Sequence, residues 1–186
     1  MMRRPIVFGL LLASLLLPTF LLAADQSSDS AIGIEPENGE LASVLRAPSL
    51  NGYYWAFHVS LPNDAKTVSL TLQLASKFEP PIAFGPMLTT AIPQSAQPAS
   101  LIICIEPIGD SLVYADHVRI TISGFNTTVR SEIDNPLRGV NTAVPYKPEP
   151  VDANTFNLAG CYKSFNIVTP ITKNADDLLS LNIKTN

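Results

Sequence analysis

The sequence has little of what most often carries chemistry in a protein. Its 186 residues include two cysteines, two histidines and one tryptophan, and only 15% of the residues are charged. Lysine and arginine form no cluster that would attract a polyanion. Clustered cations supply most of the affinity for nucleic acids and anionic lipids, because they release counterions. We therefore expect neither a nucleic acid nor a membrane surface as a partner.

Motifs for catalysis and cofactor binding are also lacking. The sequence contains no Cys-x-x-Cys pair, no Gly-x-Ser-x-Gly turn that would expose a nucleophile and no aspartate-rich calcium loop. Glu106, Asp110, Ser111, Asp116 and His117 fall in one short stretch, but turn and loop positions explain them without a catalytic role. We predict no catalytic residues and no cofactor. A small secreted hydrolase or metal-binding protein is the alternative.

Helical periodicity is nearly absent. Sixteen prolines interrupt the chain, and a proline inside a helix removes a hydrogen bond and clashes with the preceding turn. Only residues 37–46 have weak helical spacing, with Leu41, Val44 and Leu45 as the apolar set. The sequence allows one short helix at this place.

A long apolar run occurs only at the N-terminus. Residues 6–22 carry no charge, follow two arginines and end at Ala23-Ala24 before a polar segment. This is the order of a secretory signal peptide. We expect cleavage after Ala23 or Ala24 and a protein that is secreted or periplasmic. An uncleaved anchor is the alternative, but Pro18 interrupts a run at the short limit of a bilayer span.

The chain that remains after cleavage has the size of one domain. Residues 1–24 hold two of the twelve basic residues and none of the sixteen acidic ones, so their removal changes the net charge from −4 to −6. We expect a polar N-terminal segment at residues 25–48, which includes the short helix, and one domain at residues 49–186. No membrane contact is expected once the signal is removed.

Alternation of apolar and polar residues predicts strands. The odd positions of residues 53–61 and the even positions of residues 67–74 are apolar. Turn residues separate the two segments, which we expect to form a hairpin or neighbouring strands. Further strands are expected at residues 101–105, 110–114, 117–123 with an extension to 129, 161–168 and 179–184. Seven or eight short antiparallel strands, with long proline-rich loops at residues 78–99 and 134–154, predict an all-β fold, a single β-sandwich.

The two cysteines, Cys104 and Cys161, are expected to form a disulfide. An even number of cysteines in an exported protein indicates a bridge, and two buried free thiols are the alternative. A loop of this length would stabilise the fold by about 4 kcal/mol in the chain-entropy model. Its role would be structural.

Tyr54, His58 and His117 are the candidate ligand-binding residues, because each lies on the polar side of a predicted strand. Tyr54 could stack on a sugar ring, whereas Trp55 and Phe57 share the apolar phase and are expected in the core. With Met87 the histidines would suit copper. Their spacing does not bring them together, so no metal site is predicted.

Residues 54–72, a strand, a Pro-x-x-Ala turn and a second strand, resemble the bacterial pre-peptidase C-terminal domains. The resemblance implies an accessory β-sandwich, although the later aspartate-rich and glycine-tyrosine signatures of that family are absent. Asn126-Thr127-Thr128 fits the pattern of an N-glycosylation site.

These observations predict an exported, non-enzymatic module that binds a protein or glycan, as an adhesion, envelope or surface-assembly component. The alternative is a binder of small ligands or carbohydrates that uses the two long loops.

Overall fold

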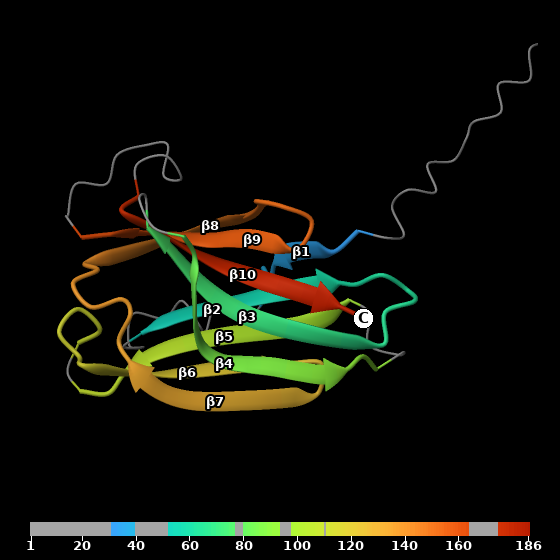
Figure 1. Cartoon of the computed structure of the whole chain (residues 1–186), viewed down its shortest axis with the longest axis horizontal. Coiled ribbons are helices and arrows are strands. Elements are labelled where there is room, and N and C mark those ends of the chain that lie inside the picture. The colour runs from blue at the N-terminus through green and yellow to red at the C-terminus, as the bar shows by residue number, and fades with distance from the viewer. Residues whose placement is uncertain (1–30, 40–51, 77–79, 94–97, 110, 164–174) are drawn as a thin grey trace, which may run out of the picture.

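Two antiparallel sheets of five strands each pack face to face in the computed structural model of the chain (Figure 1). The structure describes residues 31–39, 52–76, 80–93, 98–109, 111–163 and 175–186, and these contain no helix. The first sheet has the order β1-β2-β5-β6-β7 and the second the order β4-β3-β10-β9-β8. The strands are β1 (Gly33–Pro36), β2 (Tyr53–Ser60), β3 (Thr67–Ser76), β4 (Ile82–Ala91), β5 (Ala99–Pro107), β6 (His117–Gly124), β7 (Thr127–Asp134), β8 (Thr142–Pro150), β9 (Thr155–Tyr162) and β10 (Asp177–Thr185). The expected β-sandwich is confirmed.

The core lies between the sheets, where the apolar phase of each alternating strand meets that of the other sheet. The inner positions of the central strands are fully or almost fully buried: Trp55, Phe57 and Val59 in β2, Leu70 and Leu72 in β3, Leu101, Ile103 and Ile105 in β5, Ile120 and Ile122 in β6, and Leu179, Leu181 and Ile183 in β10. Burial of such side chains is the main stabilising contribution to a sandwich of this kind. The placement of Trp55 and Phe57 in the core is confirmed.

The expected pairing of residues 53–61 with residues 67–74 is wrong. β2 pairs with β1 and β5 in the first sheet, whereas β3 pairs with β4 and β10 in the second. The short connection at residues 62–66 crosses from one sheet to the other. The apolar faces of the two strands therefore meet across the core instead of lying side by side in one sheet.

Ten strands are present where seven or eight were expected, because three of them lie in segments that were expected to be loops or a polar tail. β4 lies within residues 78–99, β8 within residues 134–154, and β1 within the N-terminal segment. Each of these strands contains proline and each is an edge strand. A proline is tolerated at an edge because the N–H that it lacks would point away from the sheet.

Two connections at the ends of β6 differ from expectation. Residues 112–114 form turns, not a strand. Phe125 and Asn126 have φ angles of 52° and 59°, so the chain reverses after Gly124 in a two-residue turn and returns as β7. The expected helix at 37–46 lies outside the described residues from position 40 on, as do the signal peptide and residues 164–168 of one expected strand.

The expected disulfide is absent, and both cysteines are free thiols. Cys104 occupies the outer phase of β5, between the inward Ile103 and Ile105, and is half-buried. Cys161 is fully buried in the core, on the inner face of the second sheet. The backbone of the first sheet separates the two side chains, so the bridge cannot form without unfolding the sandwich.

The absence of the bridge gives a simple prediction for reducing agents. The midpoint of thermal unfolding is expected to be the same with and without reductant. Alkylation in denaturant without reductant, followed by mass spectrometry, is expected to label both thiols. A lower midpoint in reductant, together with unlabelled protein, would show that the bridge forms after all.

Candidate functional site

The structure places Tyr54 in a hydrogen-bonded position on the outer face of the first sheet. Its Oη donates to Oε1 of Glu106 on the neighbouring strand at 3.0 Å. Burial and this hydrogen bond raise the pKa of Tyr54 to about 12. The hydroxyl is therefore neutral at physiological pH. The residue is only partly exposed, so part of the surface that a sugar would need is covered.

The two histidines lie at opposite ends of the first sheet. His58 is aligned with Ser100 and Glu35 near one end. His117 begins β6 at the other end, where its Nδ1 lies 3.2 Å from Oδ1 of Asp134. Met87 belongs to β4 of the second sheet. The residues of the suggested copper set therefore do not converge, and the described part of the chain contains no group of three metal-ligating side chains.

The acidic stretch does not form a catalytic chain either. Asp116 pairs with Arg138 at 2.7 Å, while His117 pairs with Asp134. Ser111 opens a turn, and its carbonyl oxygen accepts hydrogen bonds from the N–H groups of Tyr114 and Ala115. No hydrogen bond links Ser111, Asp116 and His117 to one another among the residues that the structure describes.

Sequence reasoning missed a pair of loops that are held together at one end of the sandwich. Asn135 is 9% exposed, and its Nδ2 donates to the carbonyl oxygens of Leu112 at 2.7 Å and Ala115 at 2.9 Å. Its Oδ1 accepts a hydrogen bond from the N–H of Leu137 at 2.9 Å. One buried amide thus satisfies backbone groups of two loop segments, residues 111–116 and 135–141, and we call this arrangement the Asn135 clamp.

Backbone hydrogen bonds and apolar contacts reinforce the Asn135 clamp. The N–H of Gly139 donates to the carbonyl oxygen of Val113 at 3.0 Å, and the N–H of Asn135 donates to that of Asp116 at 2.9 Å. Beneath the two loops the buried side chains are Leu112, Ala115, Leu137 and Val140. Loops with this number of buried contacts and paired backbone groups are stiff.

These stiff loops present Tyr114, whose side chain is exposed to solvent. The exposed fraction of Tyr114 is 78%, and Ile108 in the same region is 39% exposed. The ion pair of Arg138 with Asp116 joins the two loops, and both of its side chains are about two-thirds exposed. Tyrosine and arginine on a preorganised surface lose little conformational entropy on binding, and they are enriched at the centres of protein interfaces. We call Tyr114, Ile108, Arg138 and Asp116 the Tyr114 surface.

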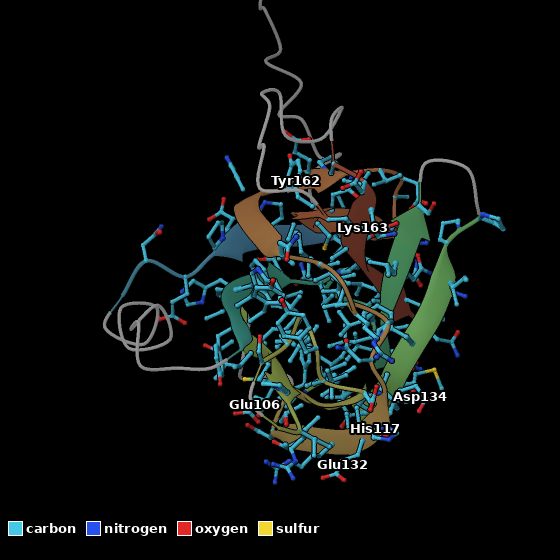
Figure 2. All side chains as sticks on the ribbon, turned by 90° about the vertical axis from the view of Figure 1, so that its left-hand side faces the viewer. Glu106, His117, Glu132, Asp134, Tyr162 and Lys163 are labelled. Atoms are coloured by element: carbon cyan, nitrogen blue, oxygen red, sulfur yellow. The ribbon has the colours of Figure 1, made fainter. Side chains whose placement is uncertain are left out.

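Pairs of oppositely charged side chains lie towards the same end of the sandwich, on to which Figure 2 looks and where it labels Glu106, His117, Glu132, Asp134 and Lys163. The ion pairs among the described residues are Arg119–Glu132, Arg130–Glu106, Arg138–Asp116 and Lys163–Asp177, and His117 forms a further one with Asp134 when the imidazole is protonated. All lie in this half of the molecule. Most are exposed and contribute little to stability. Paired charges around an exposed aromatic side chain are typical of the rim of a protein interface.

One ion pair differs, because Asp177 is buried at the end of the second sheet. Its side chain is 7% exposed, and its Oδ2 lies 3.3 Å from Nζ of Lys163, which is labelled in Figure 2. Cys161 is aligned with Asp177 across the strands. Burial, and then the negative charge of Asp177, raise the pKa of the Cys161 thiol to about 12. A thiol with this pKa is not a nucleophile at physiological pH.

A hollow of about 410 Å³ lies at the opposite end of the sandwich. Ile32, Pro62, Pro150 and Phe156 line it together with Asp152 and Asn154. It is large enough for a small molecule, but it is open to solvent. This hollow is the feature of the described structure that fits the small-ligand alternative.

The described structure is therefore a β-sandwich that exposes one aromatic side chain, Tyr114, on the stiff loops joined by the Asn135 clamp. Comparison with known protein families, with curated proteins and with solved structures finds no match. Among the described residues no helix is long and apolar enough to cross a membrane.

Proposed function

We propose that the chain is an exported, non-enzymatic β-sandwich module that binds another macromolecule through the Tyr114 surface, as an adhesion, envelope or surface-assembly component. The observation that carries the proposal is a tyrosine that is 78% exposed on loops fixed by a buried amide. A stiff loop that serves only as a connection has no need to expose an aromatic ring. The N-terminal residue pattern supports export.

The partner is expected to be a protein. A tyrosine beside an aliphatic side chain and an arginine matches the hot spots of protein interfaces. A glycan would require further aromatic rings for stacking. In β2, however, Tyr53, Trp55 and Phe57 pack in or against the core, and Tyr54 on the outer face is partly buried and hydrogen-bonded to Glu106. A glycan as the captured species would keep the binding function and change the class of partner.

Capture with matched variants tests this function. The mature wild-type protein, Tyr114→Ser and Val151→Ser would each be immobilised and exposed to the extracellular or periplasmic fraction of the native host. Val151 is 58% exposed at the opposite end of the molecule, so its substitution removes an exposed hydrophobic side chain from a different surface. We expect a partner that wild type and Val151→Ser retain and that Tyr114→Ser loses. A partner retained equally by all three proteins, or the lack of any partner, would contradict the proposal.

The hollow at the other end favours a second candidate, a site for a small ligand. Ala153→Arg would place a long side chain at its mouth without disturbing the core, since Ala153 is exposed. A ligand that raises the unfolding temperature of wild type and of Tyr114→Ser, but not that of Ala153→Arg, would support this candidate over the first.

A further inference from the structure

One of the four edge strands lacks the features that keep edges from pairing. β1 contains Pro36, β4 contains Pro86 at an irregularity in its pairing with β3, and β8 contains three prolines. Prolines and bulges are ordinary means of blocking a sheet edge. β7 has no proline, and it keeps a continuous register with β6 over all eight of its residues.

The second edge of β7 has no strand partner. β4 runs beside it at the corner of the sandwich (Figure 1), and the hydroxyl oxygens of Thr90 and Thr127 lie 2.8 Å apart. Among the described residues, however, no backbone hydrogen bond joins the two strands. The N–H and C=O groups of β7 that point away from β6 therefore have no strand partner among the described residues, which is the state of an edge that can pair with another strand.

The side chains of β7 are complementary to themselves in reverse order. Thr128, Arg130, Glu132 and Asp134 point outward and are exposed. If two copies of β7 pair antiparallel about a two-fold axis at Ser131, Arg130 of each copy lies opposite the partner's Glu132. In the inner phase Val129 lies opposite the partner's Ile133. Opposite charges and β-branched residues are favourable cross-strand pairs, and two-fold symmetry makes each of them occur twice.

The two charged groups can make these contacts while their present ones persist. Both nitrogen atoms of Arg119 that contact Glu132 bind the same oxygen, Oε1, at 2.7 and 3.1 Å. The other oxygen, Oε2, has no contact in the described part of the chain. Arg130 has only a long contact of 4.0 Å with Glu106. Charges on an edge usually discourage pairing, but here their order favours pairing with an identical strand.

We propose that the free edge of β7 pairs with β7 of a second copy, antiparallel and centred on Ser131. The first sheets of the two copies then form one continuous sheet. Each Tyr114 surface lies at the Asp134 end of its own β7, so antiparallel pairing sets the two surfaces at opposite ends of the dimer. This inference goes beyond the proposed function and does not depend on it. If both hold, the dimer is bivalent.

Sedimentation of the purified mature protein over a range of concentrations tests the dimer. We expect a concentration-dependent dimer that weakens as salt is added, since exposed charge pairs contribute to it. Arg130→Glu and Glu132→Arg each set like charges opposite each other twice, and each should raise the dissociation constant on the order of tenfold. Lys147→Glu, on the proline-containing edge strand β8, is the control that should leave it unchanged.

Mixing the two variants separates pairing from misfolding. Arg130→Glu presents two acidic residues and Glu132→Arg two basic ones, so an equimolar mixture should form a heterodimer as stable as the wild-type dimer. The double variant R130E/E132R should also dimerise, because it exchanges the charges of every pair. A wild type that stays monomeric at all concentrations, as it would if β4 shields the edge, would overturn the proposal. So would a dimer that neither single variant weakens or that mixing does not restore. None of these outcomes bears on capture through Tyr114.

Discussion

Replacing Asn135 by aspartate is expected to lower the free energy of unfolding by about 3 kcal/mol at neutral pH. The amide nitrogen Nδ2 donates to two carbonyl oxygens, those of Leu112 and Ala115. In Asn135→Asp a carboxylate oxygen takes its place, so two hydrogen bonds are lost and three oxygens face one another in a buried site. The shape of the side chain is unchanged, so the effect comes from the reversed polarity and from the negative charge placed in a buried site.

The pH dependence of this variant has a definite sign. Facing carbonyl oxygens and burial raise the pKa of the introduced carboxyl above its value in the unfolded chain. The protonated form can donate to one carbonyl, so the loss is smallest in acid and grows as the pH rises through the raised pKa. Urea unfolding followed by circular dichroism at several pH values measures this.

Asn63→Asp is the matched control, because Asn63 is exposed in the turn between β2 and β3. Its free energy of unfolding should change by no more than about 0.5 kcal/mol. Asn135→Asp should also speed amide hydrogen exchange at Gly139 and weaken partner binding, although Tyr114 itself is intact. Equal effects of the two substitutions would show that the Asn135 clamp does not hold the loops.

Raising the pH from 9 to 12 is expected to remove stability on the order of 4 kcal/mol through Cys161 alone. Burial, and then Asp177, raise the pKa of this thiol from its ordinary value of 9.0 to about 12. The unfolded chain therefore loses the proton at lower pH than the folded one. The stability is fully present below pH 9 and declines by about 1.4 kcal/mol per pH unit until the thiol of the folded protein also ionises.

Urea unfolding of wild type and Cys161→Ala at pH 9, 10 and 11 checks this prediction. The free energy of unfolding should fall less steeply with pH in Cys161→Ala than in wild type, by about 1.4 kcal/mol per pH unit. The small cavity in the variant lowers its stability at every pH. Cys104→Ala is the comparison variant. Burial, and then Glu106, raise the pKa of the half-buried Cys104 thiol to about 11, so its contribution ends at lower pH. If Cys161→Ala and wild type have parallel pH profiles, the Cys161 thiol is not shielded as the structure places it.

The central strands could be predicted because one face of each is buried and the alternation records it. Residues 53–60, 67–74, 117–123 and 179–184 are all strands with the expected phase. The edge strands could not, since half of their surface is open and prolines are tolerated there. The turn between β6 and β7 was not predicted, because Phe125 has a positive φ there and a positive φ is uncommon for a large side chain. Asn126, the other residue of the turn, also has a positive φ, and asparagine is more usual at such positions.

The state of the two cysteines and the Tyr114 surface could not be predicted from the number and type of residues. Two cysteines in an exported chain suggest a bridge, but the phase of β5 already sets Cys104 opposite to Ile103 and Ile105, away from the core. The Asn135 clamp joins residues 20 and 23 positions apart, and no local pattern identifies such contacts. Tyr114 could be recognised only after the turn around it was known to be stiff.

The order of strands in the second sheet also has a consequence for the rate of folding. β10 lies between β3 and β9, and its partner β3 begins 110 residues earlier in the sequence, at Thr67 against Asp177. β10 joins the pair formed by β3 and β4 to the pair formed by β8 and β9. Pairing over such a separation in the sequence is slow. The docking of β10 between β3 and β9 is therefore expected to be a slow step when the unfolded protein is returned to native conditions.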